Sequence, residues 1–295
     1  MRNVMSKNLI DDLVSASPNR RSFLKKIGAA TAAVGALSIA GATPAEAQSA
    51  TEVNILNFAL NLEYLEAEFY TYGLTGNSIT SFGIGIDGQA NGSNPTSGGT
   101  TVGGGQVTFS NNLIFSHDIA AEIGSDERAH VILLRTALGP AAVAKPNLNL
   151  NALGFGFGNQ NDFLRLSRIF EDIGVSAYGG AAGSLMTSSV ITTAARILAT
   201  EAQHVATVRT QIARLNITTT ALDGADLIPP PSGLTTQYLS INTSNGLPAI
   251  RTPGQVLYLA YGGVANATQG GFFPNGVNGA ITMSSAPATS ANLAT

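Results

Sequence analysis

The sequence has no cysteine, few charged residues and only three histidines among its 295 residues. Without cysteine, the chain can form no disulfide framework, iron–sulfur cluster or thiolate zinc site. Six of the 15 Lys and Arg residues precede Ala47, and the rest of the chain carries nine basic against fifteen acidic residues. No basic patch therefore remains to bind nucleic acid, and we do not expect nucleic acid as a partner.

Residues 1–47 read as an export signal and not as part of the fold. Residues 20–26 (RRSFLKK) form a twin-arginine pattern, which a modest apolar run and the A-x-A cleavage site Ala45-Glu46-Ala47 follow. The apolar run is too short and too rich in Gly and Ala for a membrane span. We expect a mature protein without an integral span, located in the periplasm or outside the cell. The alternative is an uncleaved amphipathic N-terminus.

Apolar residues at spacings of three and four predict four long helices. Their expected ranges are 54–74, 111–138, 161–186 and from 188 or 189 to 215. The connection between the last two is very short, so these helices should be antiparallel neighbours. The connection over residues 140–160 is long enough, when extended, to run the length of a bundle.

Two segments are rich in Gly, Ser, Thr and Asn and predict irregular structure. Residues 75–110 form a long loop insertion with room for a short hairpin near 106–109, and the absence of Lys excludes a P-loop there. Residues 216–295 form an irregular C-terminal extension with a short helix over 253–261. Its aromatic residues and its three charges favour packing on the bundle over disorder. The expected domains are thus 1–47, 52–215 and 216–295.

Four short motifs on the predicted helices carry candidate metal ligands. Two of the three histidines lie in Glu-x-x-His motifs, and two further helices each place a Glu seven residues before a Tyr. Residues three apart share one helical face, so a Glu and its His can reach one point. One Glu from each of two helices and Glu-x-x-His from two others is the ligand pattern of carboxylate-bridged dimetal bundles. The candidate ligands are Glu63, Glu127, His130, Glu171, Glu201 and His204.

Carboxylate oxygen and imidazole nitrogen suit iron, manganese and zinc. Four carboxylates also neutralise two divalent ions, which lowers the cost of burying the site. We therefore expect two Fe or Mn ions, with Zn as a further possibility, and small molecules or metal ions as partners.

Several neighbouring residues leave the choice of ligands open. Glu66 lies one turn from Glu63 and is an alternative ligand or a partner of one, although the matching Glu-to-Tyr spacing favours Glu63. We expect Glu52 and Glu68 on a solvated face. Tyr70 and Tyr178 lie two turns from the candidate ligand of their own helix, and we expect them to be core aromatics.

Residues 55–70 (ILNFALNLEYLEAEFY) and 270–276 (GGFFPNG) resemble the exported, desiccation-related branch of the ferritin-like superfamily. The resemblance covers most of residues 52–280 and implies an all-α four-helix bundle of antiparallel helix pairs joined by a crossover.

The resemblance also implies a role for each candidate ligand. Glu63 and Glu171 are terminal ligands, Glu127 and Glu201 are bridges, and one histidine completes each metal. The long loops and the low surface charge depart from iron-storing ferritins, so a hollow storage cage is not expected. The implied function is redox chemistry on oxygen, peroxide or iron in stress protection. The alternative is a non-enzymatic envelope protein that uses the bundle as a scaffold.

Overall fold

The computed structural model describes residues 48–89, 95–110 and 117–293. The predicted export signal and the first residues of the second predicted helix lie outside this part of the chain. Residues from Gln48 onward form one compact unit.

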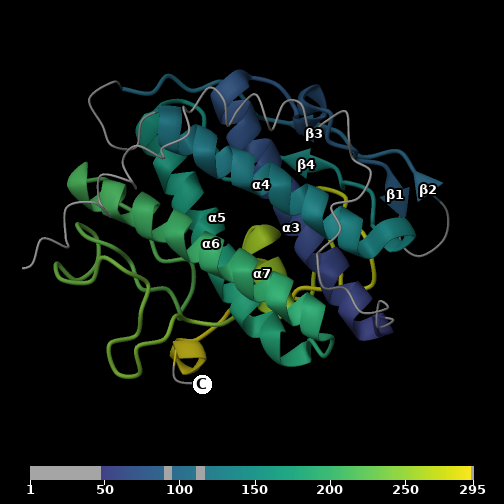
Figure 1. The fold of residues 1–295 in the computed structure, drawn as a ribbon. Coiled ribbons are helices and arrows are strands. Elements are labelled where there is room, and N and C mark those ends of the chain that lie inside the picture. Colours follow the sequence, from purple (N-terminus) through teal and green to yellow (C-terminus); the bar gives the residue numbers. More distant parts are fainter. Residues whose placement is uncertain (1–47, 90–94, 111–116, 294–295) are drawn as a thin grey trace, which may run out of the picture. The chain divides into compact units, whose positions relative to one another are not determined.

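Four long helices form the core of this unit (Figure 1), and their bounds are α3 (Ala50–Thr75), α4 (His117–Leu138), α5 (Gln160–Ala181) and α6 (Ser188–Arg214). The mostly helical architecture confirms the predicted all-α bundle. The predicted short helix is present as α7 (Pro253–Ala260), which begins at a capping box made by Thr252 and Gln255.

The ends of the helices differ from the predicted ends for local reasons. Helix α3 begins earlier because Ser49 and Glu52 form a capping box, and it ends at Gly76, whose φ of 72° favours glycine. Helix α5 stops at Ala181 and continues as the 3-10 helix η3 (Ala182–Ser184), in a stretch whose glycines lower helix propensity. Helix α6 begins at Ser188, at the earlier of the two expected starts, and Thr187 precedes it.

Side-chain contacts define the direction of the helices. Tyr64 and Thr71 of α3 contact Arg135 and Arg128 of α4, so the order of partners is reversed and the two helices are antiparallel. Helices α5 and α6 are joined by a very short connection, and they too pack antiparallel. Since α3 is also antiparallel to α5, α4 and α5 run parallel, and residues 139–159 must cross the length of the bundle. The predicted crossover is therefore confirmed.

The loop insertion after α3 contains short elements, and the hairpin expected near residues 106–109 is not among them. After the 3-10 helix η1 (Ile79–Phe82), strand β1 (Gly88–Gln89) pairs antiparallel with β2 (Pro95–Thr96). Strand β3 (Thr101–Val102) pairs parallel with β4 (Leu148–Asn149) of the crossover, which also holds the 3-10 helix η2 (Gly139–Ala141). In the stretch 106–109, the Val107 N–H instead donates to the Gly73 carbonyl of α3 at 2.8 Å.

The C-terminal extension, which ends in the 3-10 helix η4 (Ser290–Leu293), packs on the helices. Asn278 exchanges hydrogen bonds of 2.8 and 2.9 Å with Asn61 of α3. The Arg251 backbone N–H donates to Ser176 of α5 at 3.0 Å, and the Phe272 ring contacts Phe170 at a centroid distance of 5.0 Å. These contacts cover parts of α3 and α5, and the extension also reaches α6, where Arg209 Nε donates to the Tyr238 carbonyl at 3.0 Å.

Two apolar clusters fill the bundle. One contains Phe69 and Phe163, and the other contains Leu60 and Val131. Glu63 lies on α3 between Leu60 and Phe69, so polar side chains enter the core where the two clusters meet. Within the described part of the chain, no helix combines the length and the apolar character that crossing a membrane requires.

Candidate metal centre

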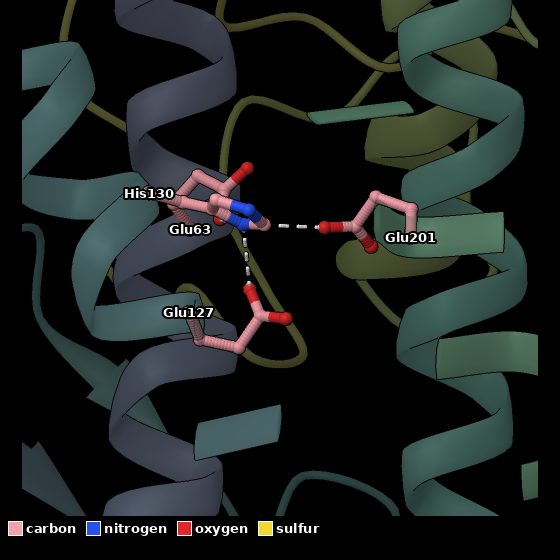
Figure 2. A group of neighbouring side chains, drawn as sticks. All are labelled: Glu63, Glu127, His130 and Glu201. Atoms are coloured by element: carbon pink, nitrogen blue, oxygen red, sulfur yellow. Dashed lines mark hydrogen bonds and ion pairs between the residues drawn. The ribbon is translucent and has the colours of Figure 1, made fainter. Parts of the chain in front are cut away.

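Three buried carboxylates surround His130 and form a group of four side chains with it (Figure 2). Its Nδ1 atom lies 3.2 Å from Glu63 Oε2, 3.4 Å from Glu127 Oε2 and 3.4 Å from Glu201 Oε1. Three helices, α3, α4 and α6, contribute these residues. Each of the four offers a ligand atom within 4.8 Å of the others, so they could hold a metal ion.

Three buried carboxylates likewise surround His204 and form a second group of four with it. The Nδ1 atom of His204 lies 3.0 Å from Glu127 Oε1 and 3.2 Å from Glu171 Oε2. Glu201 completes the group, which comes from α4, α5 and α6 and again could hold a metal ion.

Glu127 and Glu201 belong to both groups, and their burial makes them unusual. Both carboxylates are fully buried, and in the described part of the chain neither oxygen of either one has a hydrogen-bond partner. Glu127 turns one oxygen to each imidazole at 3.0 and 3.4 Å, yet without the geometry of a hydrogen bond. Buried carboxylates are costly without partners, and a cation between them would supply partners to all these atoms.

Two tyrosines hold the other carboxylates from across the bundle. The hydroxyl of Tyr70 on α3 donates to Glu171 on α5, and that of Tyr178 on α5 donates to Glu63 on α3. Each tyrosine therefore orients the candidate ligand of the opposite helix, and these hydroxyls do more than fill the core as expected. The repeated Glu-to-Tyr spacing was the sequence signal of this role, and antiparallel packing converts it into reciprocal hydrogen bonds.

Burial and mutual repulsion set the charges of the acidic groups. Burial raises the pKa of Glu63 to about 7 even though the adjacent His130 opposes the shift. Burial, followed by repulsion from Glu127, raises the pKa of Glu201 well above its usual value. Burial also raises the pKa of Glu127, but its contacts with the two imidazoles outweigh this and bring that pKa below its usual value.

The imidazoles show the opposite effect. Burial lowers the pKa of His130 and of His204, but the neighbouring carboxylates outweigh it and raise both well above the usual range. The cluster is therefore a concentration of negative charge that attracts positive charge, as protons on the imidazoles or as metal cations.

Two acidic residues of α3 do not lie on the solvated face where the sequence placed them. Glu52 is 1% exposed, and its carboxylate accepts hydrogen bonds from the backbone N–H groups of Met186 and Thr187 at 2.8 and 2.6 Å. Glu68 is fully buried, and Lys145 Nζ lies 3.3 Å from its Oε1. The expectation was wrong because other segments enclose α3 on all sides, and no face of this helix is left to solvent.

A cleft of about 260 Å³ between α4 and α6 reaches His204 from outside. The Nε2 atom of this histidine lies 3.2 Å from Asp126 Oδ2, whose side chain is 43% exposed. His204 thus faces the buried carboxylates with one ring nitrogen and the cleft with the other. Glu122 and Asp126 give the cleft an acidic lining, which attracts cations.

Comparison with known proteins agrees with this architecture. The ferritin-like domain model matches residues 51–214, which is more than half of the chain. No curated protein matches the chain. The protein belongs to the ferritin-like domain family.

Proposed function

We propose that the protein carries a dinuclear, carboxylate-bridged centre of iron or manganese. The two overlapping groups that share Glu127 and Glu201 support this proposal most directly. In this assignment Glu63 and His130 belong to one metal, and Glu171 and His204 belong to the other. Because both groups need the shared carboxylates, bridging explains why their four oxygens lack hydrogen-bond partners.

The charge of the donor set fits two cations. The four carboxylates of the two groups balance two divalent ions when both imidazoles are neutral. Hard oxygen donors with imidazole nitrogen favour iron and manganese, with zinc also acceptable. Iron or manganese in such a centre supplies one-electron redox chemistry.

Burial limits the substrate to small molecules. The ligand residues are between 0 and 7% exposed, and the cleft at His204 is the approach to them. Oxygen, peroxide or iron itself fits this access, which favours a redox role in stress protection. Tyr70 and Tyr178 would hold Glu171 and Glu63 in place during such chemistry.

The predicted export signal supports a role outside the cytoplasm. The twin-arginine pattern Arg20-Arg21 and the A-x-A site before Gln48 are the basis for this assignment. The twin-arginine route carries folded proteins, so the metals would enter the protein before it crosses the membrane.

Elemental analysis tests the proposed centre. Protein folded with Fe²⁺ or Mn²⁺ should retain close to two metal ions per chain after gel filtration. The double variant Glu127→Ala/Glu201→Ala, which lacks both shared carboxylates, should retain neither. Wild-type protein that binds no metal under either condition would overturn the proposal.

A second candidate function is a structural one, in an envelope protein that does not turn over substrate. The observation that favours it is the attachment of four helices to one deeply buried cluster, which a metal would fasten together. Exclusive binding of zinc, with no oxygen or peroxide consumed by the iron or manganese form, would support this alternative.

A further inference from the structure

Glu66 is a buried carboxylate that the proposed centre leaves unassigned. It is 4% exposed and lies on α3, one turn after Glu63. Within the described residues, no hydrogen bond or ion pair reaches it. The other buried acids of α3 all have partners: Glu52 has Thr187, and Glu68 has Lys145.

Glu66 lies beside a shared carboxylate of the proposed centre. A methyl group built on Gly174 of α5 would come within 2.4 Å of Glu201 Oε2 and 3.5 Å of Glu66 Oε1. The two carboxylates therefore approach each other over this glycine, which leaves room for both. A larger residue at position 174 would displace Glu201 first.

Glu66 and Gly174 also border a small cavity of about 20 Å³. Its remaining lining residues are apolar and include Leu62, Phe170 and Phe272. These walls provide no partner for a charged carboxylate. Among the described residues, the cavity wall is apolar apart from Glu66, and Glu201 is the carboxylate beside it at Gly174.

Charge balance shows what Glu66 adds to that cluster. The four assigned carboxylates already balance two divalent cations. A fifth buried carboxylate adds a negative charge that is costly in an apolar surrounding unless a proton or a further positive metal charge accompanies it. Replacing one divalent cation with a trivalent one supplies that charge.

We propose that Glu66 is a seventh metal ligand, which binds beside Glu201 when one of the two cations is trivalent. This inference rests on the proposed dinuclear centre and adds to it a preference for a metal pair with a summed charge of five. The six other ligands are sufficient for two divalent ions, and Glu66 then remains beside the centre without binding.

Redox-inert metals test this inference separately from turnover. Wild-type protein and Glu66→Gln are titrated with Mn²⁺ alone, and with Mn²⁺ plus one equivalent of Ga³⁺ supplied as citrate. Ga³⁺ matches Fe³⁺ in charge and size. Both proteins should bind two Mn²⁺ ions, and wild type should also form a mixed Mn–Ga pair. Glu66→Gln should bind Ga³⁺ more weakly by on the order of 10- to 100-fold, which is typical when a group that supports a metal site is lost.

Asp118→Asn provides the control, because it removes an exposed carboxylate of α4 that belongs neither to the cleft at His204 nor to the buried cluster. It should bind both metals like wild type. Equal Ga³⁺ affinity in Glu66→Gln and wild type would overturn the role of Glu66 while leaving the dinuclear centre intact. Loss of both Mn²⁺ ions in Glu66→Gln would also overturn it, because Glu66 would then be an essential ligand of the divalent pair. Wild-type protein without any metal would overturn both proposals.

Discussion

Replacing Glu63 with Gln should change the stability of the protein in opposite directions with and without metal. Burial raises the pKa of Glu63 from 4.5 to about 7. Ionisation of this carboxylate therefore opposes folding of the metal-free protein. At pH 7 the cost is about 3 kcal/mol, since each unit of pKa shift corresponds to about 1.4 kcal/mol. Gln keeps the shape and can accept the hydrogen bond from Tyr178, but it carries no charge.

The sign of the pH dependence follows from the raised pKa. Below pH 4.5 Glu63 is protonated in the folded and unfolded states, so it costs nothing. As pH rises through 4.5 toward 7, the unfolded state loses this proton first, and the metal-free wild type loses stability relative to the variant. The difference between the two proteins should thus be near zero at pH 4 and largest above pH 7.

Thermal unfolding in a chelator measures this effect. At pH 7 the variant should melt about 6 to 12 °C above wild type, as expected for about 3 kcal/mol in a domain of this size. In excess Mn²⁺ the order should reverse. A metal at 1,000 times its dissociation constant stabilises the wild type by about 4.1 kcal/mol, which exceeds the cost of about 3 kcal/mol, and the variant, which lacks one ligand, should not bind this metal at that concentration. A metal-free variant that is less stable than wild type at pH 7, or a difference that persists unchanged at pH 4, would refute the reasoning.

Three further predictions concern the ligands, the access route and export. Glu127→Ala should lose both metals, because its carboxylate belongs to both groups, whereas Glu171→Ala should weaken only one; titration calorimetry gives the stoichiometry of each, and identical losses would contradict the assignment. Asp126→Asn should slow metal uptake several-fold in stopped-flow measurements without changing the final stoichiometry, since it removes charge from the cleft but no ligand. Changing Arg20 and Arg21 to Lys should retain the precursor in the cytoplasm, and normal secretion of this variant would argue against the twin-arginine signal.

The sequence by itself was sufficient for the class of fold and for the candidate ligands. Helical periodicity located the four long helices to within a few residues, apart from the part of the second helix that is not described. The Glu-x-x-His spacing is local, since Glu127 and His130 share one face of α4 whatever else the chain does. The motifs therefore predicted which residues form the candidate site, and the structure places these residues in two overlapping groups.

Only the tertiary structure decided what surrounds those residues. Sequence reasoning placed Glu52 and Glu68 on a solvated face, because a single helix cannot reveal that the loop insertion and the later helices cover it on every side. It treated Tyr70 and Tyr178 as core aromatics, because their partners lie about a hundred residues away on an antiparallel helix. The burial of Glu66 beside Glu201 likewise depends on Gly174 of another helix. Spacing along one helix fixes which side chains point the same way, whereas burial and charge depend on contacts between segments that only folding brings together.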